Sequence, residues 1–341
     1  MPEDCLKFTH PSVDIGPMTL RNRAVLAPMS GVSDVPFRRL AWEFGAGMVV
    51  SEMVASEALT TGQEEMRLKA ESAGLPVHIV QLAGRQASWM SEATRMAEQA
   101  GANAIDINMG CPSKRVTTGY SGSALMRDLD HAMTLIDAVL SATRLPVTLK
   151  MRLGWDESAI NAPELAERAE RAGVQMITVH GRTRNQFYKG KADWTKVRAV
   201  REKIKVPLIV NGDIVDVASA RAALAESGAD GVMIGRGSYG APWLPGQIGA
   251  ALDGETLPIA PVGKELAGIV SSHYEEILSF YGFELGLRNA RKHLDWYSAG
   301  LSSHQDYKTL RRQLMTSQKP NEVHALLDLI FALDSPQRAV A

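Results

Sequence analysis

Polar side chains stand at the ends of short apolar runs throughout the first two thirds of the 341-residue chain. Barrels built from alternating strands and helices carry their chemistry at such positions, where the strands end. Polar residues in loops can serve solubility alone, but that explanation does not account for so many at strand ends. We therefore interpret them as one active site. The groups concerned are Ser30, Gln81, Asp106, Asn108, Lys150, Arg152, His180, Arg182, Asn211, Asp213 and Arg236.

Lys150 is an isolated cation inside the apolar run Val147–Met151. An unpaired buried lysine is costly, so the sequence implies a partner for its ammonium group. A reduced flavin carries negative charge near N1 of its ring, and a lysine there favours that form. A structural ion pair is the alternative for Lys150. Gln81 is suited to bond the amide edge of the same ring or simply to cap the core.

Two glycine-containing strand ends predict a phosphate site. Asn211-Gly212-Asp213 and Gly235-Arg236 offer unobstructed backbone N–H groups and one cation, as the last two strands of many barrels do. The stretch from Gly235 to Gly240 also matches a dinucleotide-binding pattern. We reject that interpretation because no strand leads to an acid at the required spacing.

Cys111 lies in a segment rich in turn-forming residues, between Gly110 and Gly122. Such a segment is typical of a mobile loop over an active site, where a thiol is able to donate a proton. The alternative is a cysteine that serves as a small buried hydrophobe. The histidines are scattered and no CxxC or HExxH pattern occurs, so we expect no metal site.

The runs that carry these groups are short and nearly all apolar, as in parallel strands buried on both faces. Three of the amphipathic stretches between them end near Gly101, Gly173 or Gly228, a left-handed stop signal. Eight alternations predict an α/β fold, a closed (β/α)8 TIM barrel, rather than an open sheet. The strands expected are Ala24–Met29, Met48–Val50, Val77–Leu82, Ala104–Asn108, Val147–Met151, Met176–His180, Leu208–Asn211 and Gly231–Ile234, and the clearest helices are Ser88–Gln99, Asp130–Ala142, Pro163–Ala172, Trp194–Lys203 and Val217–Glu226.

Beyond Pro261 only helical periodicity remains. We therefore expect a tail over residues 1–20, a catalytic barrel over 21–255 and a small all-α domain over 262–341. The net charge of −1 makes any basic surface local, and two cysteines, Cys5 and Cys111, fit a reducing compartment. No leader or membrane-spanning stretch is seen, so we expect a cytoplasmic protein. We also expect a monomer.

Three segments closely resemble the tRNA-dihydrouridine synthase family, and its bacterial B type in particular. They are Ala27–Arg38, Asn108–Val116 with its Asn-x-Gly-Cys-Pro core, and His180–Thr183. The likeness extends from about Arg21 to Trp243 and into the helical tail. Ser30 stands where many members have alanine.

The resemblance implies FMN as the bound cofactor, NADPH (or NADH) as the reductant, and Cys111 as the acid that protonates C5 of a D-loop uridine while C6 receives a hydride. Asn108 then holds the uracil edge, and Lys114, Arg152 and Arg182 take phosphate or uracil oxygens. The implied FMN contacts are Pro28, Met29, Ser30, Gln81, Lys150, His180, Asn211, Gly212, Asp213, Gly235 and Arg236.

The helical tail carries a local excess of positive charge. Arg288, Arg291 and Lys292 lie in a segment with six basic and two acidic residues between Gly286 and Arg312. Such a face suits tRNA phosphates, although a solvated helix with core aromatic residues fits equally well. Two other functions stay open: an FMN barrel that reduces a free pyrimidine, as dihydroorotate dehydrogenase relatives do, and a non-catalytic RNA-binding regulator.

Overall fold

The computed structural model describes residues 13–334, which form two compact units. The first comprises the chain up to Gly237 together with Leu244–Leu257, and the second comprises Ser238–Trp243 together with the chain from Pro258 onward. Cys5 lies outside the described residues. No helix of the described chain is long and apolar enough to cross a membrane.

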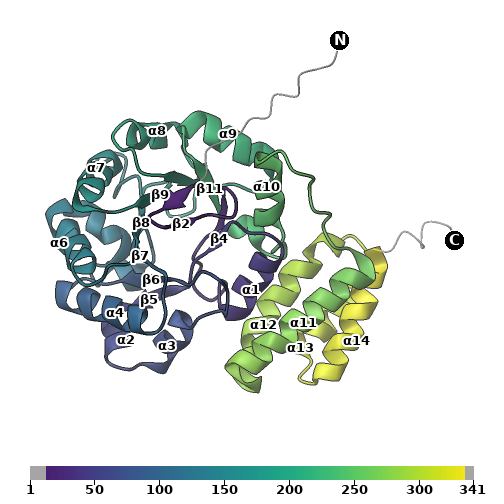
Figure 1. The fold of residues 1–341 in the computed structure, drawn as a ribbon. Coiled ribbons are helices and arrows are strands. Elements are labelled where there is room, and N and C mark those ends of the chain that lie inside the picture. The colour runs from purple at the N-terminus through teal and green to yellow at the C-terminus, as the bar shows by residue number, and fades with distance from the viewer. Residues whose placement is uncertain (1–12, 335–341) are drawn as a thin grey trace, which may run out of the picture. The chain divides into compact units, whose positions relative to one another are not determined.

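The first unit is a parallel barrel, so the predicted fold class is confirmed (Figure 1). Its sheet runs in the order β4-β3-β11-β10-β9-β8-β7-β6-β5, and both outermost strands belong to one short segment, Met48–Ala55, through which the ring closes. The strands are β3 (Ala24–Leu26), β4 (Met48–Val49), β5 (Met53–Ala55), β6 (Ile79–Ala83), β7 (Ala104–Met109), β8 (Val147–Arg152), β9 (Met176–His180), β10 (Leu208–Asn211) and β11 (Gly231–Ile234).

Helices surround the ring and follow the strands in alternation (Figure 1). Side-chain caps fix several starts, for example where Asp128 accepts the His131 N–H and where Asp216 forms a capping box with Ser219. The predicted left-handed stops are confirmed: φ is 88°, 119° and 67° at Gly101, Gly173 and Gly228. The helices are α1 (Val35–Glu43), α2 (Ser56–Thr60), α3 (Glu64–Ala70), α4 (Ala87–Gln99), α5 (Lys114–Thr117), α6 (Leu129–Leu140), α7 (Ala162–Ala172), α8 (Thr195–Arg201), α9 (Val217–Ser227) and α10 (Leu244–Leu252).

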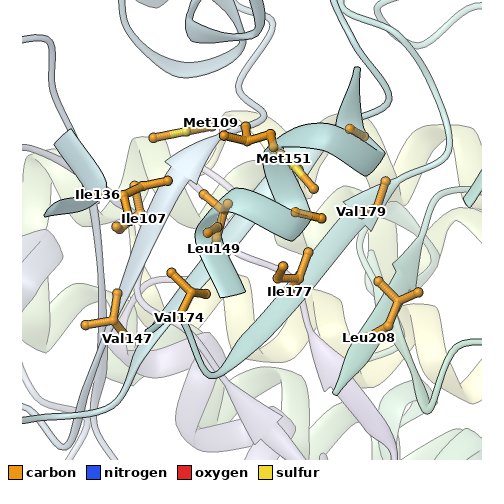
Figure 2. Packing of buried hydrophobic residues seen from close by; sticks show 14 of the residues in the cluster. Ile107, Met109, Ile136, Val147, Leu149, Met151, Val174, Ile177, Val179 and Leu208 are labelled. Carbon is orange, nitrogen blue, oxygen red and sulfur yellow. The ribbon is translucent and has the colours of Figure 1, made fainter. Parts of the chain in front are cut away.

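The period of two along each strand divides the core into two layers. Figure 2 shows Ile107, Leu149 and Ile177 of neighbouring strands in the outer layer, with Ile136 of α6. The inner layer begins with apolar side chains, Ile79, Ala104, Met176, Ile209 and Met233. Toward the C-terminal ends of the strands the inward-facing residues become polar. The charged and amide groups therefore lie at the C-terminal end of the barrel.

The expected N-terminal tail over residues 1–20 contains regular structure in the part that is described. Residues 13–20 form an antiparallel hairpin of β1 (Asp14–Ile15) and β2 (Met18–Thr19). Val13 and Ile15 are buried in the inner apolar cluster of the barrel. The segment is too short for a periodic signal, so the sequence reading missed the burial of its two alternate apolar residues.

The second unit is all helical and has its own core. Its helices are α11 (Gly263–Tyr281), α12 (Phe283–Ser298), α13 (Tyr307–Thr316) and α14 (Pro320–Phe331). Val270, Leu294, Leu327 and Phe331 are buried in it. Trp296 of α12 stacks on Tyr239 of the 238–243 segment, with ring centroids 4.0 Å apart and planes at 11°.

Candidate active site

A buried lysine stands at the C-terminal end of β8. The Lys150 Nζ donates a hydrogen bond to Asn211 Oδ1 at 3.0 Å, and the Asn211 amide donates in turn to the Met233 carbonyl at 2.7 Å. The partner that the sequence implied for this lysine is therefore a neutral amide. Burial, with the nearby Arg152 charge, lowers the pKa of Lys150 to about 8. The ammonium group still carries its charge at neutral pH and is available to an anionic ligand.

A chain of hydrogen bonds connects the barrel interior to the cysteine loop. The Asp106 carboxylate accepts from Thr148 Oγ1 and from Gln81 Nε2, each at 2.6 Å. Gln81 Oε1 then accepts from Asn108 Nδ2 at 2.7 Å. Asn108 Oδ1 accepts from the Cys111 backbone N–H at 3.0 Å. These hydrogen bonds fix which way the Gln81 and Asn108 amides point. The Cys111 N–H can only donate and the Asp106 carboxylate can only accept.

Asp106 was expected among the polar strand ends but was given no individual role, although it lies on the strand two positions before Asn108 and thus on the same face. Its side chain is buried, and burial raises its pKa. The Asn108 amide oxygen caps the loop instead of pointing freely at a substrate. The predicted contact between Asn108 and uracil stays a prediction. The hydrogen bonds above leave one N–H of the Asn108 amide for such a contact.

The Cys111 thiol lies half-buried in the loop after β7. The Ser123 N–H and hydroxyl both donate to the Cys111 carbonyl, at 3.1 and 2.8 Å, and close the loop back on itself. Gly122 permits this with φ of 59°, since a Cβ there would lie 2.9 Å from the Cys111 carbonyl oxygen. Burial raises the pKa of the thiol, so it holds its proton at neutral pH, as a proton donor must.

His180 of β9 lies between several cations. Burial and the charges of Arg152, Lys150, Arg182 and Arg236 hold its pKa well below the usual range, so the imidazole is neutral. Arg182 Nη1, which can only donate, lies 3.3 Å from His180 Nε2. The imidazole therefore accepts at Nε2 and carries its proton on Nδ1.

Glycine residues follow β10 and β11 and bring backbone rather than side chains to this end of the barrel. Gly212 has φ of 116°, and a Cβ there would lie 3.0 Å from His180 Nε2, so only glycine fits. A Cβ at Gly235 would meet nothing nearer than Met29 Sδ at 3.7 Å. The Arg236 side chain is half-exposed at the end of β11. Glycine backbone, Arg236 and the buried Lys150 together are a donor set that suits a flavin with a phosphate tail.

Asp213 contributes less to such a cradle than the sequence predicted. Its carboxylate accepts from Arg182 Nη2 at 2.5 Å and from the Ala192 N–H at 2.8 Å, and Arg236 lies 3.6 Å away. Burial tends to raise the pKa of Asp213, but these donors outweigh it and the pKa is lowered. The carboxylate thus orients two arginines.

Arg152 and Arg182 differ from the expectation that both face the substrate. Each guanidinium is buried, with 1% of the residue exposed. Arg152 donates to the carbonyls of Gly110, Thr183 and Phe187, and Arg182 donates to those of Lys189 and Gly190. Arg152 thus joins the loops after β7 and β9, and Arg182 holds the loop after β9.

The remaining predicted residues fall into three places. Pro28, Met29 and Ser30 follow β3, next to the end of β11, and the Met29 N–H donates to Ser33 Oγ at 2.8 Å. Lys114 is exposed at the start of α5. In the helical unit, Arg288 is exposed on α12, whereas Arg291 is half-buried and donates to the Ser317 carbonyl at 3.4 Å. Lys292, on the same helix, is also half-buried.

Tyr297, one of the aromatic residues of the tail, belongs to the core of the helical unit. Tyr297 is 6% exposed and its hydroxyl lies 3.1 Å from His273 Nδ1. For this tyrosine, the alternative expectation of a core aromatic residue therefore applies. No group of three or more potential metal ligands occurs within residues 13–334.

Comparison with known proteins gives one consistent family. The model of the dihydrouridine synthase family matches residues 25–335. A probable tRNA-dihydrouridine synthase of Rhodobacter capsulatus is 54% identical over 94% of this chain and 98% of its own length. The tRNA-dihydrouridine synthase B of Klebsiella pneumoniae is 41% identical, over 93% and 98%. Among solved structures, an old yellow enzyme homologue from Zymomonas mobilis has a TM-score of 0.50 at 15% identity, over 73% of this chain and 93% of its own, which shows the fold alone.

Proposed function

Because the chain belongs to the dihydrouridine synthase family, we propose that it reduces a uridine in tRNA to dihydrouridine with a bound flavin. The observation that carries the proposal is the Cys111 thiol, which keeps its proton in a loop tied to the polar end of the barrel. A thiol in that state is suited to protonate a substrate held at the mouth of the barrel.

Reduction of the uracil C5–C6 double bond adds a hydride at C6 and a proton at C5. A reduced flavin, when bound, supplies the hydride. Cys111 gives up its proton to C5, becomes a thiolate, and regains a proton from water. The positive charges of Arg152 and Lys150 act to lower the pKa of this thiol and so stabilise the thiolate that is left. General acid catalysis of this kind contributes roughly 10²–10⁴-fold.

We infer further that the flavin is FMN and that NADPH reduces it. The glycines after β10 and β11 let a single phosphate approach the backbone, with Arg236 as its cation. Lys150 would hold the negative edge of the ring, and neutral His180 would donate from Nδ1. In this proposal Arg288, Arg291 and Lys292 contact tRNA phosphates, and the reaction acts on a D-loop uridine that leaves its stack to reach the site.

The test uses purified protein without oxygen. We expect a flavin spectrum that NADPH bleaches, and we expect tRNA lacking dihydrouridine to restore the oxidised spectrum with equal formation of dihydrouridine. Heat should release FMN, identified by its mass. Oxidation of the flavin by free uracil and not by tRNA would indicate a small-molecule reductase, and absence of any flavin would contradict the proposal.

A further inference from the structure

Four side chains from three loops of the barrel form an alternating column, which we call the aromatic–arginine stack. Tyr120 and Arg127 come from the loop after β7, Trp155 from the loop after β8 and Arg184 from the loop after β9. The Arg127 guanidinium lies 5.4 Å from the Tyr120 ring centroid and 4.3 Å from that of Trp155. The Arg184 guanidinium lies 4.6 Å from the same Trp155 centroid. Cation–π contact thus joins all four groups.

The outer end of the stack is exposed and its backbone is unusual. Tyr120 is 64% exposed and has φ of 56°, the left-handed region that bulky residues rarely adopt. Such a conformation is costly for a residue with a side chain and is concentrated at functional sites. An aromatic ring that is both exposed and held at this cost presents a free face to a ligand.

The stack lacks a negative partner within the described part of the chain. Arg127 forms no ion pair there, and Arg184 donates only to neutral oxygens, those of Asn185 and Thr117, both at 3.2 Å. Two guanidinium groups over one indole repel each other. The loop from Gly110 to Arg127 adds further positive charge, exposed at Lys114 and Arg115, and contains no acid. An anion at this surface would relieve the repulsion.

The stack is continuous with the catalytic loop. Arg184 bonds to Thr117 in the loop that carries Cys111, and Gly122, two residues after Tyr120, packs against the Cys111 carbonyl. A ligand on Tyr120 would therefore contact the same loop that carries the thiol. This placement fits nucleotides next to a uridine that has left its stack.

We propose that the aromatic–arginine stack is a docking surface for unpaired nucleotides of the tRNA, with one base on the Tyr120 ring and phosphates near Arg127 and Arg184. The inference rests on the proposed function, since it assumes an RNA substrate. Single-stranded nucleic acid is bound by this combination, because every base has a face to stack and every nucleotide has a charge to neutralise. An acidic peptide would use the arginines but would gain little from the exposed ring.

The experiment compares variants at exposed positions of the holoenzyme. Y120A removes the ring and Y120F keeps it. R127M removes the charge while keeping an unbranched stem, and R95M removes one exposed charge from α4 as a control of equal net charge. Affinity is measured for tRNA, for a short oligouridylate and for inorganic polyphosphate, with flavin absorbance and the thermal midpoint as checks of the barrel.

We expect Y120A to weaken tRNA and oligouridylate binding by roughly 5- to 150-fold, the range for a stacked base, and polyphosphate binding to stay unchanged. Y120F should keep most of the affinity. R127M should reduce the slope of log affinity against log salt by about 0.7, and R95M should not.

Wild-type affinity in Y120A would overturn the inference. Equal losses of affinity for oligouridylate and polyphosphate in Y120A would also overturn it. So would loss of flavin and of thermal stability, which would indicate that Tyr120 only holds the loops together. Failure of the proposed function has a different signature: tRNA and oligouridylate would bind through Tyr120, yet no dihydrouridine would form.

Discussion

Replacement of Lys150 by methionine tests the electrostatics of the site without reference to turnover. The ammonium group is buried and bonded to a neutral amide, so the folded protein releases its proton near pH 8. In the unfolded chain the same group keeps its proton to about pH 10.4. Methionine has a similar length and no charge, and therefore removes this difference.

The sign follows from proton counting. Between about pH 8 and 10.4 the unfolded chain binds one proton more at this position than the folded chain, so the free energy of unfolding rises with pH. From pH 7 to pH 9 the gain amounts to about 1.3 kcal/mol for a folded pKa of about 8. K150M lacks this gain. At pH 7 wild type carries the full cost of a buried charge, which an anionic cofactor would offset.

The assay is urea unfolding of the flavin-free wild type and K150M at several values of pH between 7 and 9. The difference between the two curves removes the contributions of titrating groups that do not interact with Lys150. We expect wild type to gain about 1.3 kcal/mol relative to K150M. A difference that stays constant with pH would refute the argument, because Lys150 would then titrate alike in both states. FMN binding should also weaken above pH 8 in wild type, and it should be weak at every pH in K150M.

The other predictions concern the thiol, the interior carboxylate and the tail. C111A should keep flavin binding and NADPH oxidation but lose roughly 10²–10⁴-fold in dihydrouridine formation; unchanged turnover would make Cys111 a packing residue only. D106L leaves Gln81 Nε2 without its acceptor and should destabilise the protein by about 1–3 kcal/mol in urea unfolding, whereas D106N, which still accepts from Gln81, should cost less; equal costs would argue against the hydrogen-bond chain. R288A/R291A/K292A should weaken tRNA binding most at low salt and flatten the salt slope by up to about 0.9 per lost contact, with flavin content preserved; a folded triple variant with wild-type slope would place the RNA elsewhere.

The barrel was predictable because its signals are local and repeated. The expected strands Met176–His180, Leu208–Asn211 and Gly231–Ile234 have the same bounds in the structure. The second strand is different: Met48–Val50 was expected, but pairing continues after a break at Met53–Ala55. The intervening Ser51 and Glu52 are polar and hid the continuation, although both are buried.

The sequence predicts which candidate residues stand at the strand ends, but it does not predict the contacts between them. Period-two alternation places Lys150 and Asn211 at one end of the barrel, yet nothing in the sequence says that they bond to each other. Long side chains were the least predictable. Arg152 reads as a substrate ligand at a strand end, but its donors reach backbone carbonyls of two distant loops. Such partners depend on loop conformation, which single-residue patterns do not encode.

The central claim, that this chain forms dihydrouridine in tRNA, is tested most directly in cells. Dihydrouridine is mapped at each position of the tRNA from a strain without the gene, and from the same strain carrying either wild type or C111A. We predict loss at one D-loop position in the deletion strain, recovery with wild type and no recovery with C111A at equal protein level. Dihydrouridine at unchanged positions and levels in the deletion strain would contradict the account.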